Sequence, residues 1–161
     1  MDAYLDIETT GLSHVSDRVT VLGLHLGGSG RVIQWVGENI AAHRVLRVLE
    51  QSGVTTIFTY NGKRFDLPFL RNRVGIDIEG RFEHRDLMFD CWRQNLYGGL
   101  KTVERRLGVP RHLVGVDGLE AIRLWNQFEQ QGDRSALRRL LDYNKEDVIN
   151  LRAIKEIILR Q

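Results

Sequence analysis

Short hydrophobic runs that are typical of β-strands dominate the first half of the chain. β-branched and aliphatic residues cluster in these runs, and the stretch 27–30, Gly-Gly-Ser-Gly, separates two of them as a hairpin turn would. We therefore predict strands at residues 4–9, 19–26, 31–36, 55–60 and 84–88.

Hydrophobic residues recur at helical spacing over the second half. The last stretch has the clearest apolar stripe, formed by Leu137, Leu140, Leu141, Val148, Leu151, Ile154 and Ile158. Asn39 is a candidate N-cap for the first helix. We predict helices at residues 40–51, 66–74, 89–95, 101–107, 119–130 and 135–160. A hairpin-rich first half followed by helices predicts an α/β fold, in which helices pack on a mixed central sheet.

The length of 161 residues and the hydrophobic content of 42% predict a single domain over residues 1–161. Because Cys91 is the only cysteine, no internal disulfide can form, and we interpret it as a small buried hydrophobe. One cysteine fits a reducing compartment, so we expect a cytoplasmic protein. The acidic N-terminus predicts no signal peptide, and no apolar run reaches the ~20 residues that cross a bilayer, so no membrane contact is expected.

The net charge is +2, which by itself gives little support for nucleic-acid binding. Arginine supplies most of the positive charge, because lysine occurs only at positions 63, 101, 145 and 155. Arginine suits phosphate recognition, but the same composition also arises from genome bias or thermal adaptation.

The first predicted strand carries two acids on one face. Side chains alternate across a strand, so Leu5 and Ile7 share one face while Asp6 and Glu8 share the other. Neighbouring carboxylates repel each other unless a positive charge lies between them, and a hard divalent cation meets that need. The alternative is that this face is simply exposed to solvent.

Asp147 interrupts the apolar stripe of the last helix. It lies four residues before Leu151, on the buried face, where a charge must be paired or bound to a metal. Tyr143 lies one turn earlier on the same face. The alternatives are a buried ion pair with an arginine for Asp147 and a rim aromatic for Tyr143. Glu146 falls off the stripe and is expected to be solvated.

Asp66 follows the fourth predicted strand, close to Asn61. It precedes Leu67 and Pro68, so it is also a candidate helix N-cap with no further role. The functional interpretation is that the turn after the strand directs Asp66 into a site shared with Asp6. Asn61 would then hold a loop or a substrate sugar.

Three motifs, in order, resemble the DEDD superfamily of 3′–5′ exonucleases. Residues 6–12 resemble its first motif, Asp-x-Glu followed by Thr-Gly, and residues 61–66 resemble the second, Asn-x-x-x-(Phe/Tyr)-Asp. Residues 143–147 resemble the third motif of the tyrosine branch (DEDDy), Tyr-x-x-x-Asp. Residues 99–108 and 117–125 are similar to the stand-alone YprB-type group, and the likeness spans nearly the whole chain.

The resemblance implies a ribonuclease H-like fold and a two-metal-ion phosphodiester hydrolase that releases nucleoside 5′-monophosphates. Asp6 would bridge two Mg²⁺ or Mn²⁺ ions, Glu8 and Asp147 would bind the ion near the attacking water, and Asp66 would hold the second ion. Tyr143 would orient the water. The implied partner is nucleic acid, with a single-stranded 3′ end favoured.

The resemblance also implies a seat for the terminal nucleotide at Thr9, Gly11 and Leu12. Leu12 and Phe65 are candidate apolar walls for its base, although plain core packing is as good an interpretation of Phe65. Possible phosphate contacts are Lys63, Arg64, Arg105, Arg106, Arg138 and Arg139, each of which is otherwise an ordinary solvated charge.

Other functions stay open at this point. An endonuclease or structure-specific nuclease of the same fold would carry the same acids. A non-catalytic nucleic-acid-binding subunit is a further alternative, against which the presence of all four acids argues. A helical interaction domain with purely structural acids is a third.

Overall fold

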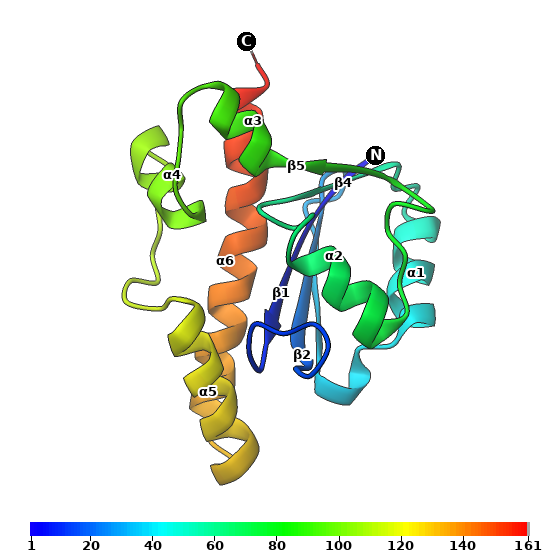
Figure 1. Ribbon diagram of the computed structural model, residues 1–161, viewed down its shortest axis with the longest axis vertical. Helices are drawn as coiled ribbons and strands as arrows, with labels where there is room; N and C mark the ends of the chain where they lie inside the picture. Colours follow the sequence, from blue (N-terminus) through cyan, green and yellow to red (C-terminus); the bar gives the residue numbers. More distant parts are fainter. Residues whose placement is uncertain (161) are drawn as a thin grey trace.

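We describe residues 1–160 in a computed structural model, in which five strands form one mixed sheet (Figure 1). The strands are β1 (Asp2–Thr9), β2 (Val19–Leu26), β3 (Val32–Val36), β4 (Thr56–Thr59) and β5 (Glu83–Asp86). Their order in the sheet is β3-β2-β1-β4-β5. β1 pairs antiparallel with β2, and β2 with β3, whereas β4 runs parallel to both β1 and β5. The predicted mixed sheet is confirmed.

The helices agree with the predicted ones apart from their ends. They are α1 (Ala42–Gln51), α2 (Asp66–Phe69), α3 (Leu87–Arg93), α4 (Leu100–Leu107), α5 (Gly118–Gln131) and α6 (Arg134–Ile158). A π-helical turn, η2 (Leu70–Val74), extends α2, and a 3-10 turn, η1 (Gly37–Asn39), precedes α1.

The prediction that Asn39 caps the first helix is wrong. Helix α1 begins after Ala41, which supplies no side-chain cap. Asn39 ends the intervening turn η1, and its side chain accepts a hydrogen bond from Arg44 at 3.1 Å. The extra turn moves the helix start three residues beyond Asn39. The Asn39 side chain therefore contacts the first turn of the helix without capping it.

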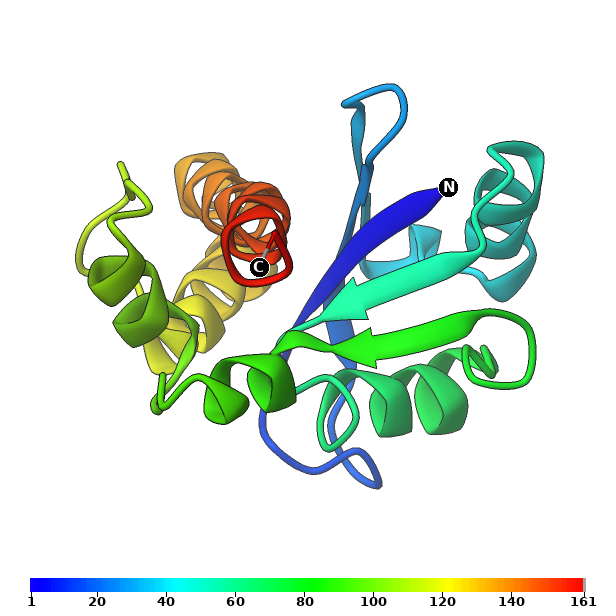
Figure 2. The same ribbon diagram turned by 90° about the horizontal axis from the view of Figure 1, so that it is seen from above.

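Helices cover both faces of the sheet (Figure 2). Helices α1 and α2 pack on one face, against a core that includes Leu5, Ile7 and Ile57. Helices α3, α4 and α6 cover the other face, where Tyr4 and Phe58 point into a second core. A third core joins α5 to α6 and to β2. The alternation along β1 therefore sends Asp6 and Glu8 toward α6.

Cys91 is completely buried in the second core, as predicted. Burial raises the pKa of its thiol to about 11, because the apolar surroundings disfavour the thiolate. No helix within residues 1–160 combines the length and the apolar character needed to cross a membrane.

Candidate metal centre and nucleic-acid interface

The site is built where the middle of β1 faces α6. Glu8 is 8% exposed and Asp147 6% exposed, so both carboxylates are nearly withdrawn from water. One carboxylate oxygen from each of Asp6, Glu8 and Asp147 lies within 4.8 Å of the other two. The structure thus brings together a strand pair of acids and a helix acid that are about 140 residues apart in the sequence, as the sequence predicts.

Asp66 approaches β1 from the edge of the strand that faces β4. β4 pairs with β1 only as far as Tyr4, which leaves the Ile7 N–H without a strand partner. The Asp66 carboxylate accepts this N–H at 3.1 Å. The alternative that Asp66 caps its helix is wrong, because Phe65 occupies the N-cap position and Asp66 is the first helical residue. Asp66 stands outside the group of three acids whose oxygens lie within 4.8 Å of one another.

Burial and mutual repulsion disfavour charge on these acids. Burial raises the pKa of both Asp6 and Glu8 well above the ordinary range, and the charge of Asp147 raises both further. Burial also raises the pKa of Asp66 to about 7. For Asp147 burial raises the pKa to about 6, and the nearby Arg111 guanidinium opposes that rise.

The donor set fits a divalent cation. One oxygen of Glu8, Oε1, is buried and has no hydrogen-bond partner among the described residues. A buried acceptor is normally hydrogen-bonded. An unpaired carboxylate oxygen beside two further carboxylates therefore indicates a ligand that the protein itself does not supply. Carboxylate oxygens are the ligands that Mg²⁺ and Mn²⁺ prefer. Asp6, Glu8 and Asp147 could therefore hold one such ion together.

The metal-free protein should lose stability as the pH rises. The pKa values of Asp66 and Asp147, about 7 and 6 in the folded state, exceed the ordinary value of 3.8, so the folded state binds more protons between these limits. The stability contributed by these two carboxyls is then full below about pH 4 and declines as the pH rises through the folded-state values. We expect a net loss of roughly 1–2 kcal/mol, which lowers Tm by about 2–8 °C between about pH 5 and 8.

Two histidines act in the opposite direction. Burial lowers the pKa of His25 and His84, so their contribution rises with pH, and the expected fall is a net value. Thermal unfolding in EDTA and in Mn²⁺ measures the effect. At about pH 8 an ion present at a hundredfold excess over its Kd should restore about 2.7 kcal/mol. A metal-free Tm that rises steadily from pH 5 to 8 would contradict the clustering of the acids.

Asn144, which the sequence patterns did not single out, orients Asp6. It is completely buried on α6, and its amide N–H₂ donates to the Asp6 carboxylate at 3.0 Å and to the Asp6 carbonyl at 3.2 Å. Its carbonyl accepts from Gln34 at 2.9 Å. The close approach needs a glycine opposite, because a Cβ on Gly23 would lie 2.1 Å from Asn144 Oδ1. The feature of the sequence that indicates a role for Asn144 is its position as a polar residue on the buried face of α6, next to Tyr143.

Arg111 forms the buried ion pair that was the alternative interpretation of Asp147. Its guanidinium donates to Asp147 and, through two N–H groups, to Glu104 at 2.7 Å each. Glu104 is 1% exposed, so its buried carboxylate neutralises much of the Arg111 charge. One arginine shared with Glu104 does not balance Asp6, Glu8 and Asp147 together. The ion pair therefore coexists with an excess of negative charge that a cation would offset.

The prediction that Glu146 is solvated is wrong. Its carboxylate accepts the backbone N–H groups of His112 and Leu113, the latter at 3.0 Å, and its side chain is 12% exposed. The segment between α4 and α5 folds back over α6, and its free amides need an acceptor. Glu146 ties this segment down and so helps to place Arg111.

Asn61 occupies a strained turn that Asp86 supports. Its φ of 60° lies in the left-handed region, which asparagine tolerates better than most residues. The Asp86 carboxylate accepts the backbone N–H of Asn61 at 2.8 Å and that of Lys63 at 3.1 Å. It also caps α3 by accepting from Met88 at 3.1 Å. One buried acid therefore fixes the loop that carries Asn61 to the site.

The residues predicted to bind the terminal nucleotide differ in their exposure and packing. Thr9 is buried, and its hydroxyl donates to the Gly11 carbonyl at 2.6 Å, which tightens the turn after β1. Leu12 is 79% exposed in that turn and so presents an apolar surface to solvent. Phe65 is half-buried, with its ring centroid 5.0 Å from that of Phe69, so it packs on the first core.

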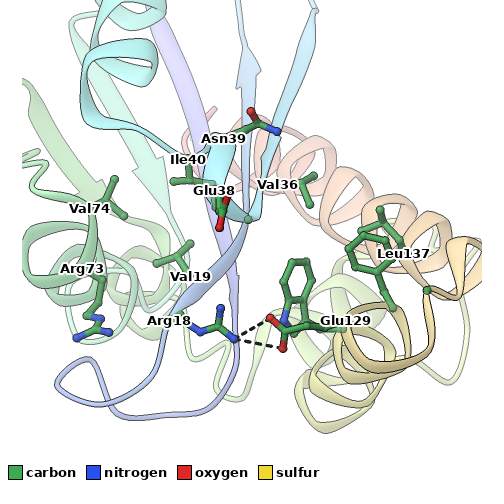
Figure 3. Close-up of a pocket in the computed structure, with 14 residues that line it drawn as sticks. Arg18, Val19, Val36, Glu38, Asn39, Ile40, Arg73, Val74, Glu129 and Leu137 are labelled. Atoms are coloured by element: carbon green, nitrogen blue, oxygen red, sulfur yellow. Dashed lines mark hydrogen bonds and ion pairs between the residues drawn. The ribbon is translucent and has the colours of Figure 1, made fainter.

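A cavity of about 560 Å³ opens beside the acids. Its wall includes Asp6, Asn61, Tyr143 and Asp147. A larger cavity, of about 910 Å³, lies between β2, η1 and α5, and Arg18 and Glu129 pair across it at 2.9 Å (Figure 3). None of the five predicted catalytic residues lines the larger cavity, whereas Asp6, Tyr143 and Asp147 line the smaller one.

Known sequences resemble this chain over nearly its full length. The family described as RNase_H superfamily matches residues 3–159. Protein MJ0365 of Methanocaldococcus jannaschii is 29% identical over 157 residues, which cover 91% of this chain and 88% of MJ0365. YprB of Bacillus subtilis is also 29% identical, over 92% of this chain but only 39% of YprB. The predicted likeness to YprB is confirmed, and the chain spans well under half of that protein.

Solved structures share the fold. The family B DNA polymerase of Pyrobaculum calidifontis superposes with a TM-score of 0.79 at 18% identity, over 98% of this chain and 24% of the polymerase. Brucella melitensis NrnC, in its structure bound to pGG, gives a TM-score of 0.66 at 18% identity, over 99% of this chain and 72% of NrnC. Together with the family match, these likenesses confirm the predicted ribonuclease H-like fold.

Proposed function

Because this chain belongs to the RNase_H superfamily, we propose that it is a metal-dependent nuclease, and more specifically a 3′–5′ exonuclease of the DEDDy type. The observation that carries the proposal is the convergence of Asp6, Glu8 and Asp147, with an orphaned oxygen on Glu8. The finer assignment, to 3′–5′ action, is supported by the three motifs and by Tyr143, which lies one helical turn before Asp147. The substrate would be DNA or RNA with a single-stranded 3′ end.

The acids would divide two ions between them. Asp6, Glu8 and Asp147 would hold one ion, and Asp66 would help to hold the second, in keeping with its place apart from the other three. Mg²⁺ or Mn²⁺, when bound, supplies the positive charge that activates water and stabilises the leaving oxygen. Asn144 would keep the Asp6 carboxylate turned toward the other acids through its 3.0 Å hydrogen bond.

The chain's own groups position the reactants. Burial and the neighbouring acids raise the pKa of Tyr143, so its hydroxyl stays protonated and would orient the water rather than remove its proton. The water oxygen would bond to phosphorus while the bond from phosphorus to the 3′-oxygen breaks. The products would be a nucleoside 5′-monophosphate and a strand shortened by one residue with a free 3′-hydroxyl. Leu12 and Asn61 would contact the terminal nucleotide.

Incubation of matched DNA and RNA single strands, labelled at the 5′ end, with Mg²⁺ or Mn²⁺ tests the proposal. We expect a ladder that shortens one nucleotide at a time, together with released 5′-monophosphates, and no reaction in EDTA. Internal cuts that appear early in the reaction would favour an endonuclease of the same fold. Strands that are bound but left intact with every divalent metal would show a binding subunit instead.

Replacing Tyr143 with phenylalanine should slow hydrolysis less than the loss of an acid. The substitution removes one hydrogen bond to the water, which is worth about 1–3 kcal/mol, so we expect kcat to fall roughly 10–100-fold. The ring, which Leu140 and Trp125 help to bury in the third core, should keep its packing. Single-turnover kinetics with a short strand measure the change.

Tyr97→Phe is the matched control. Tyr97 is 56% exposed, and its hydroxyl donates only to the nearby Asn95 at 3.2 Å. We expect its kcat to stay within about twofold of the wild type, since surface changes of this kind have small effects. A Tyr143→Phe variant as inactive as a variant that lacks Asp6 would show that the phenol takes a direct part in proton transfer.

A further inference from the structure

Two cations beside the acidic cavity have no carboxylate partner in the described part of the chain. Lys101, in the first turn of α4, and Arg64, in the turn before α2, both line the cavity that Asp6 and Asp147 border. Neither forms an ion pair within residues 1–160, whereas Arg85, Arg111 and Arg152 do. Their charges are therefore available to a ligand in this cavity.

Aromatic rings hold both side chains. The Lys101 ammonium lies 4.3 Å from the centre of the Tyr143 ring and donates a hydrogen bond to its hydroxyl. The Arg64 guanidinium lies 5.5 Å from the Trp92 ring and 5.7 Å from the Phe89 ring. Stacking on a ring positions a cation without neutralising it. A lysine ammonium has three donors, so Lys101 keeps donors free after the bond to Tyr143.

Arg111 differs from Lys101 and Arg64, because its charge is already paired with carboxylates. It also lies near Tyr143, 5.7 Å from the ring, but its side chain is only 12% exposed and it pairs with Glu104 and Asp147. Lys101 instead faces the cavity, and its charge opposes the rise in pKa that burial causes in Glu8 and Asp147, as expected for an ammonium close to both carboxylates. A phosphodiester that reaches water held by Tyr143 would come within reach of Lys101.

We propose that Lys101 is a further catalytic residue that donates to a non-bridging oxygen of the phosphodiester under attack, and that Arg64 binds the next phosphate of the strand. The assignment rests on the proposed function, because it places the reacting phosphate between the acids and Tyr143. Negative charge on the non-bridging oxygens is held most effectively by a donor that is already in place. Lys101 is such a donor, since the Tyr143 ring fixes its ammonium before substrate arrives.

Lys101→Met, Lys101→Arg and the control Lys145→Met test the proposal. Methionine keeps an unbranched stem on the Tyr143 ring, and Lys145 is an exposed lysine on α6 that makes no side-chain hydrogen bond or ion pair in the described chain. With Mg²⁺ we expect kcat/KM to fall about 100-fold for Lys101→Met. Lys101→Arg should recover about tenfold of this loss, because charge returns with altered geometry. Lys145→Met should stay within about twofold of the wild type.

The salt dependence of binding gives a readout independent of turnover. With Ca²⁺ in place of Mg²⁺, the slope of log K against log salt for a single strand should become shallower by ~0.7 in Lys101→Met, and by a similar amount in Arg64→Met, one contact each. The Lys145→Met slope should not change. An unchanged slope, a kcat/KM within about threefold of the wild type, or no gain from arginine over methionine would overturn the assignment. If the wild type hydrolyses nothing, the proposed function fails, and the slopes still decide whether Lys101 contacts phosphate.

Discussion

Asp6→Asn should abolish hydrolysis while leaving the protein folded. Asp6 would help to hold both ions, so its loss should weaken the binding of each, and we expect kcat to fall by at least about a thousandfold. Asparagine keeps the shape of the side chain and can still bond to Asn144 through its carbonyl oxygen. Strand cleavage under single-turnover conditions, with Mn²⁺ binding followed by calorimetry, measures both losses.

The same substitution should stabilise the metal-free protein. The charges of Glu8 and Asp147 and the burial of the site raise the pKa of Asp6, so its charged form opposes folding at neutral pH. Removing that charge should raise Tm in EDTA at about pH 8 by about 2–4 °C for each 1 kcal/mol of relief. Asp2→Asn is the control on the same strand, where Asp2 pairs with Lys155 at 3.0 Å. An Asp6→Asn protein that is both inactive and unfolded would indicate a structural acid instead.

Asp147→Ala should be nearly as severe. The substitution removes the α6 ligand from the group of three acids, and we expect at least about a thousandfold loss of kcat. The fold should survive because Arg111 keeps its two hydrogen bonds to Glu104, each at 2.7 Å. Circular dichroism and Tm check the fold, and single-turnover cleavage measures the rate.

Asp142→Asn is the matched control on α6. Asp142 is exposed and lies five residues before Asp147, on the opposite side of the helix. Its substitution should change kcat by no more than about twofold. A folded Asp147→Ala protein with wild-type activity would remove Asp147 from the site and leave only its ion pair with Arg111 as a role.

Local patterns in the sequence predicted the scaffold well. Alternation along residues 4–9 placed Asp6 and Glu8 on one face, and β2 has the predicted bounds, Val19–Leu26. Helical spacing likewise placed Tyr143 and Asp147 on the buried face of α6. These features depend on neighbours within a few residues, and that is the range over which periodicity carries information.

The groups that support the site could not be predicted in the same way. Asn144 bonds to Asp6 across 138 residues of sequence, and Arg111 reaches Asp147 across 36. No local pattern shows which group such a residue will meet, because only the packing of α6 on β1 and of the α4–α5 segment on α6 brings the partners together. The prediction for Glu146 is wrong for the same reason, since its partners, the amides of His112 and Leu113, come from that segment. A polar residue on a buried helix face was the usable signal, and it applied to Asn144.

Anomalous diffraction from crystals soaked in Mn²⁺ would show whether the four acids hold metal ions. We expect two peaks ~3.5–4 Å apart, one bound by Glu8 and Asp147 and the other near Asp66, with Asp6 between them. The orphaned Glu8 oxygen should be a ligand of the first. Crystals that show no manganese among these four carboxylates, at a Mn²⁺ concentration that supports hydrolysis in solution, would contradict the proposed metal centre.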